Sequence, residues 1–367
     1  MILTICLPPA RAERAAKDRN VYFHSDLTMR LVFCGTPQFA VPTLKHLLAQ
    51  PDFHIDVVIS QPDRPRGRGH QVSYSAVKET ALAANLQVLQ PEKIRSPESE
   101  QLLREAAPDL IVIIAYGQII PARLLSIPRL GWINLHASLL PKYRGAAPIQ
   151  WAIANGETTT GLTSMRIDAG MDTGDILLQR ETPIAPAETT PQLAERLSQL
   201  GAPLMAETLR GLRDASLQPK PQNHGEATLA PLLKKEDGQI NWQQSAQVIY
   251  NRMRAFTPWP GAYTTFRGTT CQLTSSAGFS APSRGVGELN LACAAVETPT
   301  STPPSTTTAA PTPSAPGTIH YDGKTLCVSC GEESLLRIAR VKPEGRKEVS
   351  ATDFANGAHV HSGEQFG

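Results

Sequence analysis

The sequence predicts an α/β doubly wound, Rossmann-like domain on a mostly parallel sheet, followed by a small OB-like β-barrel domain. From residue 29 to about 215, strand-like and helix-like patterns alternate. The run Leu110–Ala115 is apolar on both faces, which is typical of a strand covered by helices on both sides of a parallel sheet. Beyond residue 235 this alternation stops and short strand-like pieces follow one another, which favours a barrel.

The elements of both domains can be placed in order. Strands are expected where short apolar or alternating runs occur, and helices where apolar residues recur every three or four positions. Thr190 is expected to cap the longest helix, with Pro191 at its first position. The expected strands of the first domain are residues 31–34, 54–60, 86–89, 110–115, 133–138, 160–167 and 176–178, and its helices are 41–48, 75–85, 98–106, 145–153 and 190–204. The second domain is expected to contain a helix at 245–254 and strands at 262–266, 271–274, 289–292, 318–321, 326–329 and 335–341.

Composition predicts the domain boundaries. Residues 1–28 lack the apolar core of a signal peptide and contain three acidic residues, so we expect a disordered extension. The first domain then covers residues 29–215, a polar, proline-containing linker covers 216–234, and the barrel covers 235–367. Within the barrel, residues 298–316 carry no charge and are nearly all Thr, Pro, Ser and Ala, which predicts a disordered insertion.

Charge, cysteines and hydropathy narrow the class of protein. The formal net charge of +2 gives no global reason to expect nucleic acid, so any such contact must come from a local basic cluster. No run reaches the roughly 20 apolar residues that span a bilayer, and we expect no membrane partner. Six scattered cysteines favour a reducing, cytoplasmic setting. Cys327 and Cys330 have metal-ligand spacing, but no second pair completes a site, so we expect no metal.

The candidate catalytic residues follow the central strand. Asn134, His136 and Ser138 project from one face of a strand, because side chains alternate along it. The strand ends before Pro141, and the carboxyl edge of an open α/β sheet is where such folds place their chemistry. Asp172, in a glycine-flanked loop, can turn toward the same edge.

These residue types suit group transfer between two bound substrates. An asparagine N–H and a protonated histidine can both donate to a developing oxyanion. An aspartate can hold the tautomer and charge of the imidazole. Since no nucleophile accompanies Asn134, His136 and Asp172, direct transfer is favoured over a covalent intermediate.

A basic loop follows the second expected strand. Arg64, Arg66 and Arg68 alternate with prolines and glycines over residues 61–70, which predicts an irregular loop with a positive field. Attraction of phosphate and simple solvation both fit this composition. Its place on the same sheet edge as the polar cluster favours a function. The earlier turn Gly35-Thr36-Pro37 lacks any nucleotide-binding fingerprint.

The run from Asn134 to Pro141, with Asp172 after it, resembles the formyltransferase family that uses 10-formyltetrahydrofolate. Further segments resemble the branch of that family that acts on methionyl-tRNA: residues 33–40, 61–69, 141–150, 172–175 and 254–260. The likeness covers residues 29–290 and resumes at 316.

The resemblance implies a role for each matched residue. Asn134, His136 and Asp172 match the catalytic residues, and Ser138, Leu139, Leu140 and Pro141 match the tetrahydrofolate contact. Arg68 matches an arginine that reaches the acceptor end of the tRNA, and Arg64 and Arg66 add charge beside it. The implied protein is a cytoplasmic monomer that moves a formyl group from 10-formyltetrahydrofolate to the α-amine of initiator methionyl-tRNA, without metal, while its barrel holds the tRNA.

Three other functions stay open from the sequence. A formyltransferase acting on a free nucleotide in purine synthesis would share the three catalytic residues but needs only the first domain. A formyltransferase acting on a sugar-nucleotide amine is the second alternative. The third is a non-catalytic RNA-binding protein, against which the aromatic content of 5% and the lack of a stacking ladder both argue.

Overall fold

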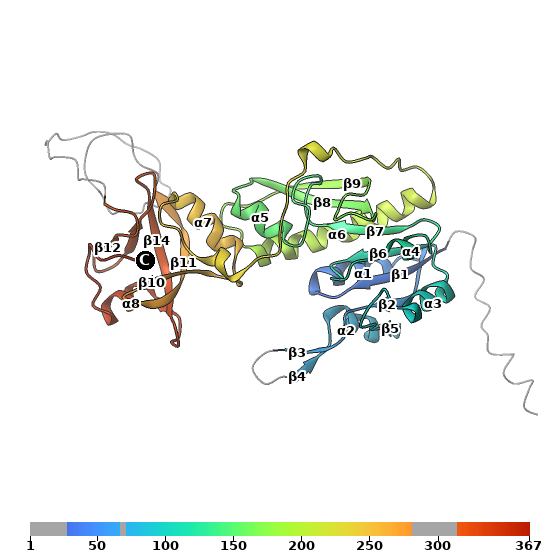
Figure 1. Ribbon diagram of the computed structural model, residues 1–367, viewed down its shortest axis with the longest axis horizontal. Coiled ribbons are helices and arrows are strands. Elements are labelled where there is room, and N and C mark those ends of the chain that lie inside the picture. The colour runs from blue at the N-terminus through green and yellow to red at the C-terminus, as the bar shows by residue number, and fades with distance from the viewer. Residues whose placement is uncertain (1–27, 67–70, 281–313) are drawn as a thin grey trace, which may run out of the picture.

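The structure, a computed structural model, describes residues 28–66, 71–280 and 314–367 (Figure 1). The expected extension at 1–28 lies outside the described residues except for its last residue. So do the strand expected at 289–292 and the insertion at 298–316 up to residue 313. Figure 1 shows an α/β domain and a β domain side by side along the long axis, with helices α5 (Pro148–Ala154) and α7 (Ala246–Ala255) at their junction.

The first domain is built on a seven-stranded sheet in the order β5-β2-β1-β6-β7-β8-β9. The pairs among β5, β2, β1, β6 and β7 are parallel, whereas β8 and β9 are antiparallel additions. From β1, the strands β2 and β5 are added on one side of the sheet, and β6 and β7 are then added on the other side, as in a doubly wound fold. The strands are β1 (Met29–Gly35), β2 (Phe53–Ile59), β5 (Gln87–Leu89), β6 (Leu110–Ile114), β7 (Trp132–His136), β8 (Thr159–Arg166) and β9 (Ile176–Pro183).

Both faces of this sheet are covered, as the apolar run of β6 predicts. Leu110, Val112 and Ile114 pack into one core cluster, and Ile111 and Ile113 pack into another on the opposite face. The helices of this domain are α1 (Val41–Leu48), α2 (Ala76–Ala83), α3 (Pro97–Ala106), α4 (Ala122–Leu125), α5 and α6 (Thr190–Arg213), with a short 3₁₀ turn η1 (Gln38–Ala40) before α1. The α/β doubly wound prediction is confirmed.

Three local predictions were wrong. β7 ends at His136, so Ser138 lies in the loop after the strand and not on the strand face that carries Asn134 and His136. Thr189, not Thr190, caps α6, because the Gln192 side chain accepts from the Thr189 backbone N–H at 2.9 Å and completes a capping box. Residues 61–70 are also not irregular throughout, since β3 (Arg64–Arg66) pairs antiparallel with β4 (Gln71–Ser73). Pro65 is tolerated there because this ribbon has only two strands, so the missing N–H interrupts no wider ladder.

The second domain is an antiparallel sheet in the order β10-β11-β14-β13-β12, with β15 added to β14. Isolated bridges join Phe266 of β10 to Phe366, and Thr318, beside β12, to Gln365. The last residues of the chain therefore bring the two edge strands together, as a barrel requires. The elements are η3 (Lys235–Gly238), α7, β10 (Ala262–Phe266), β11 (Thr269–Ser280), β12 (Ile319–Tyr321), β13 (Leu326–Ser329), β14 (Leu335–Pro343), β15 (Val349–Ser350) and α8 (Ala351–Gly357).

The two domains meet through packed side chains. The rings of Trp151 on α5 and Phe256, just after α7, lie edge to face with centroids 5.7 Å apart. The buried guanidinium of Arg254 donates to the Glu188 carbonyl at 3.0 Å and the Ala185 carbonyl at 3.3 Å. These contacts hold α7 against the turn that precedes α6.

Candidate active site

Strand β7 carries Asn134 and His136 in the interior of the sheet. Asn134 lies opposite Ile113 of β6 on one side and Met165 of β8 on the other. Its side chain is half-buried, and within the described parts of the chain no hydrogen bond engages its amide. The amide is therefore available to a substrate. His136, two residues further on, is buried and lies on the same face of the strand.

The ring of His136 is held in one orientation. Its Nε2 lies 2.8 Å from the carbonyl oxygen of Tyr143. A carbonyl oxygen only accepts, so Nε2 must carry a proton. The other ring nitrogen, Nδ1, lies 3.6 Å from Oδ2 of Asp172. Any second proton on this imidazole therefore sits on Nδ1, beside the carboxylate.

The carboxylate of Asp172 is held by the loop that follows β7. The backbone N–H of Gly145 donates to Oδ2 of Asp172 at 2.9 Å. Asp172 itself has a φ of +54°, a left-handed conformation that is uncommon for a residue other than glycine. The structure thus brings together His136 and Asp172, which are 36 positions apart in the sequence, at the edge where β7 places Asn134.

The loop after β7 is braced internally. Thr163 Oγ1 donates to the Ser138 carbonyl at 2.7 Å, and the Leu140 N–H donates to Thr163 Oγ1 at 3.1 Å. Ser138 Oγ donates to the Lys142 carbonyl at 2.6 Å. Ser138 and Leu140 are buried, whereas Leu139 and Pro141 are half-exposed. These hydrogen bonds therefore hold the conformation of the loop, and Leu139 and Pro141 form its more accessible part.

A polar cavity of about 410 Å³ opens at the same edge of the sheet. It is lined by the residues that follow β1, β2 and β6 and by the base of the β3–β4 hairpin: Thr36, Pro37, Gln61, Pro62, Asp63, Arg64, Ser73, Ser75, Ala115, Tyr116 and Gly117. The register pairs Gly35 with Ile114 and Ile113 with Asn134, so the carboxyl ends of β1 and β7 are about two strand spacings, or roughly 10 Å, apart. The cavity therefore lies within a substrate's length of His136.

The base of the hairpin is anchored beside this cavity. The Lys78 ammonium pairs with Asp63, and Gln90 Nε2 donates to the same carboxylate at 2.9 Å. The hydrogen bond from Lys78 holds the pKa of Asp63 below its usual value. Arg64 is exposed and Arg66 ends β3, while Arg68 lies outside the described residues. Figure 1 shows the hairpin projecting from the sheet.

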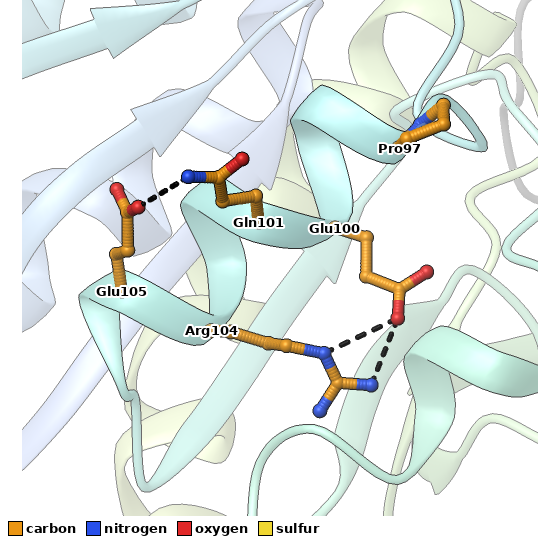
Figure 2. A pocket seen from close by; sticks show the side chains of 5 residues that line it. All are labelled: Pro97, Glu100, Gln101, Arg104 and Glu105. Carbon is orange, nitrogen blue, oxygen red and sulfur yellow. Dashed lines mark hydrogen bonds and ion pairs between the residues drawn. The ribbon is translucent and has the colours of Figure 1, made fainter.

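A second hollow, on the outer surface of α3, is of a different kind. Figure 2 shows it lined by Pro97 and by two side-chain pairs along the helix. Arg104 donates to Glu100 at 2.8 Å, and Gln101 donates to Glu105 at 2.8 Å. These pairs satisfy one another on a solvent-facing helix surface, so we assign the hollow no role.

The described residues contain neither a metal-binding cluster nor a membrane-spanning helix. Among them, no three His, Cys, Asp or Glu side chains gather in a way that could hold a metal ion. No helix in the described ranges is long and apolar enough to cross a membrane.

Sequence reasoning missed several residues of this site. Gly145 supplies the N–H that holds Asp172, and Tyr143 supplies the carbonyl that orients His136. Both lie in the segment that follows Asn134 and His136 in the sequence. The glycine after the turn at Pro141 is the one sequence feature that could have indicated their role. Gln222 donates to the Asp172 carbonyl at 2.9 Å, although it comes from the expected linker. Nothing in the local sequence marks Gln222.

Comparison with known proteins places this geometry in a family. Residues 29–209 match the family model described as formyl transferase, and residues 232–359 match the formyl transferase C-terminal domain. The chain is 48% identical over 340 residues to a methionyl-tRNA formyltransferase of Koribacter versatilis and 47% identical over 339 residues to one of Solibacter usitatus, with 92% of this chain and 99% of each relative covered. Among solved structures, the fold is similar to that of a Helicobacter canadensis N-formyltransferase, with a TM-score of 0.56 and 16% identity over 85% of this chain and all of that one. Two domain models that together match most of the chain, and relatives matched along nearly their full length, show that this protein belongs to the formyl transferase family.

Proposed function

We propose that this protein, as a cytoplasmic monomer, transfers the formyl group of 10-formyltetrahydrofolate to the free α-amine of initiator methionyl-tRNA. The observation that carries the proposal is the pairing of His136 Nδ1 with Asp172 beside a polar cavity at the carboxyl edge of the sheet. Two relatives that share both domains carry the name methionyl-tRNA formyltransferase. A free-nucleotide formyltransferase would have no need of the second domain.

Three side chains would carry the chemistry. Asn134 donates its amide N–H to the formyl oxygen as this oxygen gains negative charge, and His136 donates from Nδ1 to the same oxygen. Asp172 stabilises the proton on Nδ1 and accepts the proton that the attacking amine releases, which then passes to the N10 leaving group. One C–N bond forms and one breaks, so one proton moves and no external base is required. Tyr143 and Gly145 contribute by holding His136 and Asp172 in place.

The folate side of the site would lie against exposed apolar side chains. Met171, next to Asp172, is 60% exposed, and Ile119, in the loop after β6, is 91% exposed. Ile120, next to Ile119, is buried in the core cluster against which Ile167, before the Asp172 loop, also packs. A planar ring system would cover such apolar surface. The Ser138–Pro141 loop would form the adjoining wall, with Leu139 and Pro141 as its accessible part.

The acceptor side would use the cavity, the hairpin and the barrel. The aminoacyl end would enter the cavity lined by Thr36 and Gln61, while Arg64, Arg66 and Arg68 attract the phosphates that follow it. On the barrel, β14 and the turn after it, residues 337–348, contain five Arg or Lys and two Glu. Lys342 pairs in register with Gln272 of β11, and both side chains are exposed. This net positive strip would bind the body of the tRNA.

An acceptor comparison tests the proposal. The purified protein is incubated with 10-formyltetrahydrofolate and, in separate reactions, methionyl-tRNA, glycinamide ribonucleotide and an amino-sugar nucleotide. We expect formylation of methionyl-tRNA alone, and loss of that product in His136→Ala. Formylation of either small acceptor in place of the tRNA would overturn the proposal.

A further inference from the structure

The segment between α6 and α7 runs along the two loops that carry the candidate site. Lys220 and Ile176 exchange backbone hydrogen bonds, both at 2.9 Å, just after the Asp172 loop. Further on, the Arg144 N–H donates to the Thr228 carbonyl at 2.8 Å, and the Ala230 N–H donates to the Arg144 carbonyl at 2.7 Å. This segment therefore contacts both the loop that contains Asp172 and the loop that follows β7 and ends at Gly145.

Gln222 is the side chain at the middle of that segment, and it is buried. Its Nε2 donates to the Asp172 carbonyl at 2.9 Å and to the Gly174 carbonyl at 2.7 Å. Its Oε1 accepts from Nε of Arg144 at 3.1 Å and from Nη2 at 2.7 Å. The amide thus uses both of its donors and both of its acceptor sites.

The orientation of this amide is determined by its partners. A guanidinium only donates, and a carbonyl only accepts, so the oxygen of Gln222 must face Arg144 and the nitrogen must face the Asp172 loop. Arg144 is itself buried, and its third contact is with His224 Nδ1 at 3.2 Å. Arg144 therefore fixes which way Gln222 points.

Asp172 needs such support because of its backbone. A left-handed conformation is strained for a residue other than glycine and persists where the surroundings hold it. Gly145 holds the carboxylate of Asp172, and Gln222 holds its carbonyl. Without the second contact the backbone could relax, and the carboxylate would move away from Nδ1 of His136.

We propose that Gln222 is a positioning residue for formyl transfer, which rests on the function proposed above. Its amide, oriented by Arg144, keeps Asp172 in the backbone conformation that places the carboxylate beside Nδ1 of His136. Gln222 acts through Asp172 and touches neither substrate.

The substitution Gln222→Glu tests this role. Glutamate keeps both acceptor contacts with Arg144 but has no N–H for the carbonyls of Asp172 and Gly174. With the full-length protein, 10-formyltetrahydrofolate and methionyl-tRNA, we expect kcat to fall about 10- to 100-fold with little change in either KM. Gln101→Glu, the same change on the surface of α3 (Figure 2), should keep the wild-type kcat. A wild-type kcat in Gln222→Glu would overturn the inference.

Two further variants separate positioning from folding. Gln222→Met removes the contacts on both sides, so its kcat should fall as far as that of Gln222→Glu, and it should also melt at a lower temperature. If only Gln222→Met is impaired, Gln222 merely satisfies the hydrogen-bond donors of Arg144, and the inference is wrong.

In an Asp172→Asn background, Gln222→Glu should cause no further loss of kcat, because the residue that Gln222 positions no longer acts. An additive loss would contradict action through Asp172.

A crystal structure of Gln222→Glu gives a readout that does not depend on activity. We expect the Asp172 carboxylate to lie farther from His136 Nδ1 than in the wild type, and an unmoved carboxylate would overturn the inference. If the wild-type protein formylates methionyl-tRNA but Gln222→Glu behaves identically, the positioning role fails and the proposed function stands. If the wild type formylates none of the acceptors, both fail.

Discussion

Oδ2 of Asp172 lies 3.6 Å from Nδ1 of His136, while the other ring nitrogen is bound to the Tyr143 carbonyl. The carboxylate therefore faces the one ring nitrogen that can gain or lose a proton during the reaction. The role of Asp172 should therefore depend on the charge of its carboxylate as well as on its shape.

Asp172→Asn should lower kcat by about 10²- to 10⁴-fold, because the amide can still accept from the Gly145 N–H but cannot take up a proton. The binding of the folate substrate should be retained. Steady-state kinetics and a folate-binding titration measure the two effects. The matched control is Asp168→Asn, in the same loop, whose carboxylate is exposed and bonds to Thr173. Equal kcat values in the two variants would contradict the role of Asp172.

Asn134→Ala should lower kcat by about 100- to 1000-fold, the usual loss when one oxyanion donor is removed. Asn134→Asp keeps the shape but replaces the donor with a carboxylate, so it should lose at least as much. Single-turnover formylation rates with saturating substrates isolate this step. An aspartate variant as fast as the wild type would show that the side chain donates no hydrogen bond to the reacting oxygen.

Gly145→Ala should impair both folding stability and turnover. Gly145 has a φ of +122°, and a Cβ at this position would lie 2.7 Å from the Ala230 carbonyl oxygen. Relief of that collision would move the N–H that holds Asp172. Gly131→Ala is the control, since φ is +85° there but a Cβ meets nothing within 4 Å. We expect melting temperatures to fall in both variants and kcat to fall only in Gly145→Ala.

Replacing Arg64, Arg66 and Arg68 with glutamine should raise the KM for methionyl-tRNA and leave kcat nearly unchanged. The logarithm of KM should also depend less steeply on the logarithm of salt concentration, by about 0.7–0.9 for each phosphate that the variant no longer neutralises. Arg104→Gln removes an arginine that pairs with Glu100 on α3 and should not change this slope (Figure 2). A triple variant with the wild-type slope would exclude the hairpin from tRNA binding.

Asp52→Asn should destabilise the first domain at neutral pH. Asp52 accepts from Arg210 at 2.9 and 3.0 Å, and this hydrogen bonding is the main cause that lowers the pKa of Asp52 below its ordinary 3.8. Because the folded state prefers the charged form, the stabilisation is present above that ordinary pKa and is lost as the pH falls through the folded value. We expect urea unfolding at pH 7 to show a loss of about 0.5–1 kcal/mol, small because water screens the partly exposed Arg210. This difference should shrink below about pH 4, and a difference independent of pH would contradict the assignment.

The features that repeat locally along the chain could be predicted from the sequence. The alternation in β7 places Asn134 and His136 on one face, and the apolar run of β6 requires a sheet covered on both sides. Both follow from the two-residue period of an extended backbone, which holds whatever the rest of the chain does. The segments that resemble the formyltransferase family could also be identified from the sequence, because each is a continuous run of residues.

The tertiary structure determines which distant groups meet. It selected Nδ1 of His136 as the nitrogen that faces Asp172, and it brought Gln222 to Asp172 from 50 positions away. It also paired β3 with β4, where proline and glycine content predicted no regular structure. Such contacts depend on the packing of the whole chain, since a single hydrogen bond between remote residues leaves no periodic trace in the sequence.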